Sequence, residues 1–79
     1  MSKQIKLIWD FRGPNASQIA KHHAIHLGEF AQIEKLKNTI HGSEKISDAH
    51  YIAYLIVDEK HMQELREVLK PNRGQKYAP

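Results

Sequence analysis

The sequence predicts an α+β fold in which an antiparallel sheet carries two helices on one face. Three observations predict it. Apolar residues alternate along the first strand-like stretch, as they do in a strand with one buried face. After a Gly-Pro turn they recur at three- and four-residue steps, as in an amphipathic helix. The stretch YIAYLIV, residues 51–57, is apolar on both faces, which is typical of a central strand.

The first half of the chain predicts a strand followed by a long helix. The strand carries its apolar residues at every second position and ends at Gly13-Pro14; these residues are Ile5, Leu7, Trp9 and Phe11. Asn15 and Gln18 have the spacing of a capping box, so a helix is expected from Ala16 to about Lys37.

The second half predicts two strands, a helix and a short final segment. A strand between Asn38 and Ile46 is weakened by Gly42 and is therefore expected at a sheet edge. Asp58 is a good N-cap for a second helix, which Lys70-Pro71 ends. Residues 71–79 form a basic C-terminal tail or a short edge strand, with residues 75–78 as the candidate strand.

This order, strand, helix, strand, strand, helix and a possible short strand, favours a two-layer ferredoxin-like plait. The alternative is a related α+β layer that lacks the fourth strand. At 79 residues the chain has room for one domain, residues 1–79.

Composition narrows the functional classes. The chain has no cysteine, which excludes disulfides and thiolate metal sites, and the sequence indicates no cofactor. The N-terminal stretch MSKQIKLIWD is neither a signal peptide nor a membrane span, so a cytoplasmic protein without membrane association is expected. The 12 basic and 9 acidic residues are interspersed, so nucleic acid is not expected as a partner.

In a plait, the end of the first strand meets the start of the third strand and the end of the second helix. Basic and polar side chains converge there, and they form a candidate site for a small anionic ligand: Asp10, Arg12, Asn15, His23, His50 and Arg73. The alternative is that Arg12 pairs with Asp10 or with a carbonyl of the tail as a structural contact.

The histidines suggest two further hypotheses. His22, His26 and Glu29 follow one another at about one helical turn, a spacing that can hold a divalent metal, although such pairs usually carry none. His23 points toward the sheet instead, and His23 or His50 is the candidate general base of a small cofactor-independent enzyme.

The open face of the sheet should expose Ile8 and alternate residues of the 51–57 strand. Such a patch is too apolar for a monomer, so a homodimer through the open sheet face is expected.

The stretches WDFRGP and KPNRGQKY, in a chain of this length, resemble a family of small uncharacterised bacterial proteins with a ferredoxin-like plait. The resemblance implies the fold and a dimer, and it implies no catalytic residue. The favoured hypothesis from the sequence is a homodimeric binding module for a small anionic molecule, with a His-dependent enzyme and a His-bound divalent metal as the alternatives.

Overall fold

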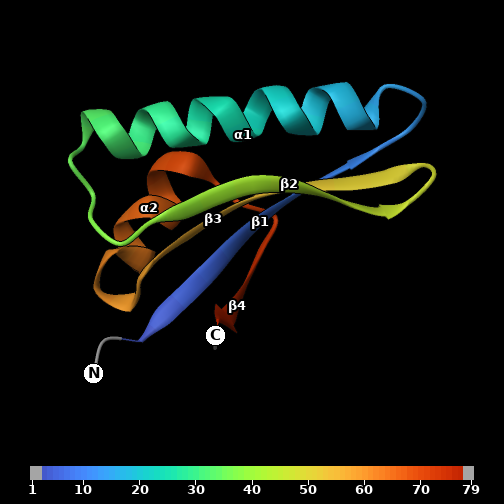
Figure 1. Ribbon diagram of the computed structural model, residues 1–79. Coiled ribbons are helices and arrows are strands. Elements are labelled where there is room, and N and C mark those ends of the chain that lie inside the picture. The colour runs from blue at the N-terminus through green and yellow to red at the C-terminus, as the bar shows by residue number, and fades with distance from the viewer. Residues whose placement is uncertain (1–2, 78–79) are drawn as a thin grey trace.

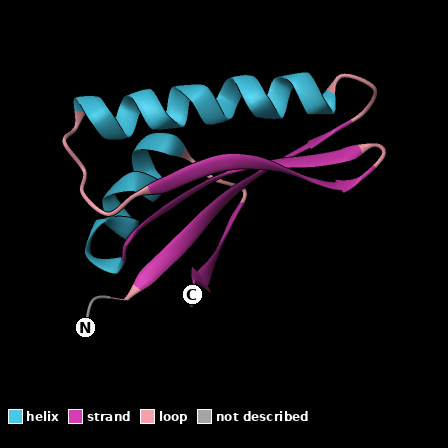
Figure 2. Cartoon of the chain, in the orientation of Figure 1, coloured by secondary structure: helices cyan, strands magenta, loops and turns pink. Residues whose placement is uncertain are grey.

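In the computed structural model, which describes residues 3–77, the chain forms a four-stranded sheet with two α-helices (Figure 1). The elements follow in the order β1 (Gln4–Arg12), α1 (Ala16–Ile33), β2 (Ile40–Ser47), β3 (His50–Asp58), the short 3₁₀ helix η1 (Glu59–His61), α2 (Met62–Leu69) and β4 (Arg73–Tyr77). Figure 2 shows α1 lying over the sheet as a separate layer. The α+β class that the sequence predicts is confirmed.

The strand order in the sheet is β2-β3-β1-β4, and every neighbouring pair is antiparallel. β1 and β3 occupy the centre, while β2 and β4 are the two edges. The predicted edge position of β2 and the central position of β3 are both confirmed. A fourth strand is present and begins at Arg73, earlier than expected, while Ala78 lies outside the described residues.

Both helices pack against the same face of the sheet. Their buried side chains meet the residues of β1 and β3 that point to this face, and the cluster comprises Ile5, Leu7, Trp9, Ala24, Leu27, Ala31, Ala53, Leu55, Val57 and Leu65. The indole Nε1 of Trp9 also donates a hydrogen bond to the carbonyl of Leu69, over 3.1 Å, which ties the end of α2 to β1. Apolar burial of this kind is the main stabilising contribution in so small a chain.

The His41 ring of β2 lies against α1 at Gly28. A Cβ atom on Gly28 would lie 2.5 Å from Nε2 of this exposed ring, so the ring occupies the space that a side chain at residue 28 would take. The other side chains of α1 that face the sheet are also small, since four of the five buried residues of the helix are alanines.

The helix ends differ from the sequence prediction. α1 ends at Ile33 rather than near Lys37, because Lys35 is left-handed, with φ of 55°. The amides of Leu36 and Lys35 then donate to the carbonyls of Ala31 and Gln32, which is a Schellman ending with lysine where glycine is usual.

The predicted caps are also wrong in detail. Asn15 makes no side-chain cap hydrogen bond, since its ψ of 10° is not the extended conformation that turns a cap side chain back toward the helix. Asp58 likewise makes none, because η1 intervenes and α2 begins only at Met62.

The open face does not carry the exposed apolar patch that the sequence suggests. Ile8, Ile52 and Ile56 are only 1%, 2% and 2% exposed in the single chain. Polar side chains of neighbouring strands cover this face: the Lys6 ammonium lies 4.6 Å from the centre of the Tyr54 ring. That ring crosses Gly42, where a Cβ atom would lie 2.8 Å from the Tyr54 hydroxyl. A monomer therefore needs no partner to shield these isoleucines.

Candidate functional site

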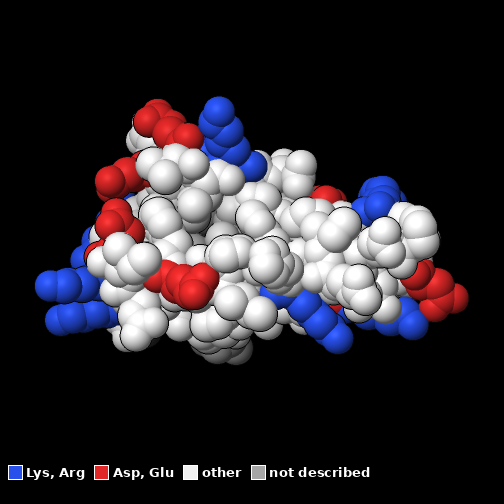
Figure 3. Space-filling view, turned by 90° about the horizontal axis from the view of Figure 1, so that it is seen from above, with Lys and Arg blue, Asp and Glu red and all other residues white. Residues whose placement is uncertain are grey.

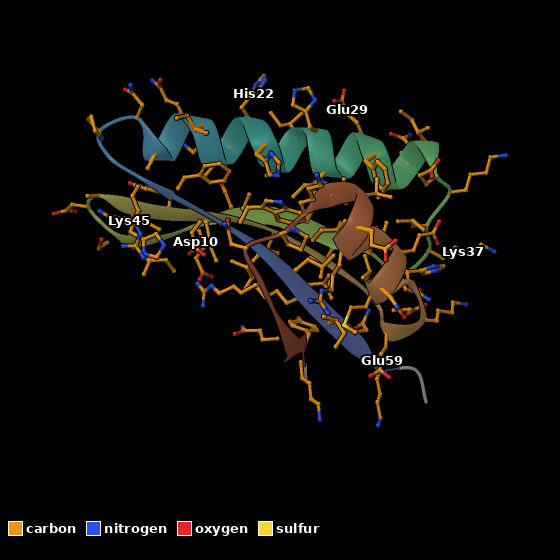
Figure 4. All side chains as sticks on the ribbon, turned by 180° about the vertical axis from the view of Figure 1, so that it is seen from behind. Asp10, His22, Glu29, Lys37, Lys45 and Glu59 are labelled. Carbon is orange, nitrogen blue, oxygen red and sulfur yellow. The ribbon has the colours of Figure 1, made fainter. Side chains whose placement is uncertain are left out.

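A polar cluster on the open face joins three strands. The carboxylate of Asp10 on β1 lies 2.7 Å from Nε2 of His50 on β3. Nε and Nη2 of Arg73, the first residue of β4, each donate to this carboxylate over 3.2 Å. The side chain of Asn72 accepts a hydrogen bond from the Asp10 amide over 2.8 Å. Asp10 is therefore the centre of the cluster, and Figure 4 shows it on the side of the sheet away from α1.

The position of each group follows from strand pairing. Asp10 stands opposite Ile52 and Arg12 stands opposite His50 in the β1–β3 ladder, so all four residues share a face. Arg73 stands opposite Ile8, which brings its guanidinium to the same face. The left-handed Lys70 and the Asn72 amide, which donates to the Ile8 carbonyl, turn the chain back into β4.

The electrostatics of the cluster favour an ionised Asp10. Burial raises the pKa of the Asp10 carboxyl, but the hydrogen bonds from His50 and Arg73 outweigh burial and hold the pKa below its ordinary value of 3.8. The Asp10 and His50 side chains are 20% and 13% exposed, so solvent screens this contact less than a surface pair. Arg73, whose side chain is 50% exposed, is the outer member.

The structure brings together three of the six predicted ligand-binding residues, Asp10, His50 and Arg73. Arg12 lies beside them, on the same face, and makes no ion pair with any other residue in the 3–77 range. The expected structural contact to Asp10 is made by Arg73 instead. Asn15 stands at the start of α1, exposed and beyond the end of β1.

His23 is separated from the cluster by the sheet itself. Its ring lies 5.1 Å from the Trp9 ring and 5.5 Å from the Phe11 ring, measured between centroids. Trp9 and Phe11 alternate with Asp10 along β1, so they face the helices while Asp10 faces the opposite way. His23 and His50 therefore do not share a site.

The environment of His23 favours its neutral form. Burial lowers the pKa of His23 below 6.5, and the neighbouring His26 and His22 lower it further. Its Nε2 atom is buried without a hydrogen-bond partner in the described structure. His23 thus resembles a core aromatic more closely than a general base.

The candidate metal residues form a hydrogen-bonded row on the outside of α1. Nε2 of His26 lies 2.9 Å from Nε2 of His22, and Nδ1 of His26 lies 3.0 Å from a carboxylate oxygen of Glu29. Both ring nitrogens of His26 therefore have partners, on opposite sides of the ring. The three residues form a chain of contacts and do not surround a single point at which a metal ion could bind. Within residues 3–77 no group of three or more His, Asp or Glu residues has an arrangement that could hold a metal ion. His22 and Glu29 point away from the sheet in Figure 4.

A groove between α2 and β4 is the second feature of the site region. Its volume is about 320 Å³, within the range of small-molecule sites. Ile5 and Met62 provide apolar lining, while Arg66 and Lys76 provide positive charge. None of its lining residues in the described range is acidic. Arg73 and Asn72 border it as well, so the groove adjoins the Asp10 cluster through β4.

The sequence pattern places Arg73 and Asn72 near this end of the fold but does not identify Arg66 or Met62 as groove residues. Arg66 lies in the last turn of α2, where a basic side chain is ordinary on helix-dipole grounds. Its spacing from the tail residue Lys76 depends on the turn at residues 70–72, which no sequence pattern encodes.

Charges elsewhere are mixed. In the view over α1, basic and acidic side chains are interspersed, and no single basic surface is visible (Figure 3). No helix in residues 3–77 combines the length and the apolar character needed to cross a bilayer. Comparisons with protein-family models, curated proteins and solved structures find no match to this chain.

Proposed function

We propose that the chain is a binding module for a small anionic molecule, and that the molecule binds in the groove between α2 and β4. The observation that carries this proposal is the lining of the groove: Arg66 and Lys76 supply positive charge, and no described lining residue is acidic. A concave site that combines apolar walls with a few charged groups is typical of small-molecule recognition.

The lining also defines the ligand class. A carboxylate or phosphate group pairs with the Arg66 guanidinium, which presents a planar pair of donors, and with the Lys76 ammonium. Ile5 and Met62 offer contact to a short apolar part of the same molecule. Asp10 contributes indirectly, because it binds Arg73 and so fixes the start of β4, from which Lys76 projects.

The test compares two doubly substituted proteins of equal net charge. Arg66→Gln with Lys76→Gln removes both groove cations, whereas Lys35→Gln with Lys37→Gln removes two exposed cations after α1. Binding of inorganic phosphate, acetate and hexanoate is measured by amide chemical shifts in low-salt buffer. The groove variant should bind at least about tenfold more weakly, which corresponds to about 1.4 kcal/mol. The control should match the wild type.

Two results would contradict the proposal. The first is that none of the three anions shifts amides around the groove at millimolar concentration. The second is that the control variant weakens binding as much as the groove variant does, because this would identify general charge attraction. Hexanoate binding more tightly than acetate supports the contribution of Ile5 and Met62.

The Asp10–His50 contact favours a second candidate function. A carboxylate that binds one imidazole nitrogen fixes the orientation of the ring and leaves the other nitrogen to face a substrate, which suits a small enzyme. The hydrolysis of p-nitrophenyl acetate tests this: a rate above buffer that His50→Gln abolishes supports catalysis, and equal rates exclude it for this ester. We favour anion binding over catalysis because His50 lines neither the groove nor the hollow formed by Gln63, Glu67 and Lys70.

We also infer that the fold is the ferredoxin-like plait. The strand order β2-β3-β1-β4, the antiparallel pairing throughout and the helices that follow β1 and β3 support this assignment. Small-molecule binding is one of many functions that such a scaffold can carry, so the fold does not by itself support the function.

A further inference from the structure

The two edges of the sheet differ in a way that bears on assembly. β4 is five residues long, contains Arg73 and Lys76, and borders the groove. β2 is eight residues long and pairs only with β3 among the described strands, so its outer side offers backbone groups to another strand. Figure 1 shows β2 along the sheet beneath α1.

Exposed isoleucines lie near both ends of this edge. Ile40 and Ile46 are 46% and 48% exposed, and they stand at opposite ends of β2 with Ser43 midway between them. In an antiparallel pairing of two β2 strands about a twofold axis at Ser43, Ile40 of each copy lies opposite Ile46 of the other. Shifting this register by two residues leaves the isoleucines opposite polar residues or glycine, so one register is favoured.

The same register suits the remaining residues of the strand. It places Gly42 opposite Glu44 and His41 opposite Lys45, so no two acids and no two lysines face each other. Two of the six large exposed hydrophobic residues in the described structure, Ile40 and Ile46, thus lie on this edge.

The irregularity of β2 limits how far such pairing can extend. The β2–β3 register shifts between Lys45 and Ser47, which marks a bulge at Ile46. Bulges and charged residues on an edge stop continuous strand addition. A closed twofold pair buries both β2 edges and leaves only the short, basic β4 edges outside.

We propose that a second copy of this chain binds along β2, antiparallel and centred on Ser43, so that one sheet continues through both copies. The β4 groove lies at the opposite edge, so this dimer is independent of the proposed anion binding. This interface differs from the one expected from the sequence, which lies on the open face. The isoleucines of that face are already buried within the single chain.

The experiment measures molecular mass against concentration by sedimentation equilibrium, beginning from a monomer of 9.2 kDa. The wild type should approach twice this mass as its concentration rises. Ile40→Lys should weaken dimerisation at least about tenfold, since it places a charge opposite Ile46. Combining Ile40→Lys with Ile46→Glu should restore the dimer, because the new lysine of one copy faces the new glutamate of the other.

Control variants distinguish pairing along β2 from association through another surface of the molecule. Ile33→Lys, at a position 75% exposed at the end of α1, should leave the dimer unchanged. Circular dichroism and thermal unfolding establish that each variant is folded. A wild type that stays monomeric at millimolar concentration overturns the proposal, as does a dimer that is insensitive to Ile40→Lys. A double variant that stays monomeric overturns the register centred on Ser43.

Discussion

Replacing Asp10 with alanine should destabilise the fold by about 2 kcal/mol, most of it through His50. The carboxylate accepts one contact from His50 and two hydrogen bonds from Arg73. The His50 side chain is 13% exposed, so losing its partner costs about 1–2 kcal/mol. The Arg73 side chain is half exposed, and its pair contributes only about 0.5 kcal/mol.

The assay is urea unfolding at pH 7, followed by thermal unfolding. A loss of about 2 kcal/mol lowers the melting temperature of a domain of this size by roughly 10 °C. Asp48→Ala is the matched control, because the Asp48 side chain is 99% exposed and its ion pair in the described structure is with Lys45 in the same hairpin. The control should unfold like the wild type.

The pH dependence of the same variant provides an independent check. Since the pKa of Asp10 in the folded state lies below 3.8, its contribution is complete above that pH and is lost as the pH falls through the folded-state pKa. The alanine variant should therefore lose less stability on acidification than the wild type. The central role of Asp10 is refuted if the free energy of unfolding of Asp10→Ala lies within about 0.5 kcal/mol of the wild-type value and if both proteins lose stability equally as the pH falls.

Three further outcomes follow from the core and from α1. Leu55→Ala, at a position 0% exposed, should cost about 2–5 kcal/mol in urea unfolding, and a smaller loss would mean that the core collapses around the cavity. Gly28→Ala should stabilise the protein by about 1 kcal/mol in a His41→Ala background, since alanine is favoured over glycine in a helix, and by less when the His41 ring must move aside; equal gains in the two backgrounds would mean that the ring does not press on residue 28. Because the pKa of His23 is lowered in the folded state, the contribution of His23 to stability is constant above pH 6.5 and falls as the pH drops from there to the folded-state pKa. His23→Phe, which keeps an aromatic ring beside Trp9, should remove this loss below pH 6.5, and an unchanged slope would assign it to another group.

The parts of the fold that the sequence predicted are those governed by simple periodicity. Alternation along β1 and the continuous apolar run of β3 follow from burial on one face or on both, and antiparallel pairing then brings Asp10 to His50. The α1 boundary was wrong because Lys35 adopts a left-handed conformation that the sequence signals only when glycine stands there.

The site was predicted less completely, for two physical reasons. The sequence predicts His23 beside Asp10 because both lie near the same end of β1, but Trp9 and Asp10 alternate along the strand, so His23 packs on the helix face and Asp10 lies on the opposite face. The groove depends on the distance between α2 and β4, which is set by packing of Leu65 and Met62 against the sheet. No local pattern determines that distance. The prediction of an exposed apolar patch on the open face was wrong for a similar reason, because side chains from neighbouring strands cross this face and cover its isoleucines.

The two lysines that end the helices in a left-handed conformation have a consequence for engineering. Lys35 and Lys70 have φ of 55° and 50°, values that strain a residue with a Cβ atom but not glycine. Both positions lie in turns, and both are exposed. Replacing either lysine with glycine should therefore stabilise the protein without changing the floor of the groove or the β2 edge. Glycine at these turns offers a stabilised background in which disruptive substitutions at Asp10, Arg66 or Ile40 can be studied while the protein stays folded.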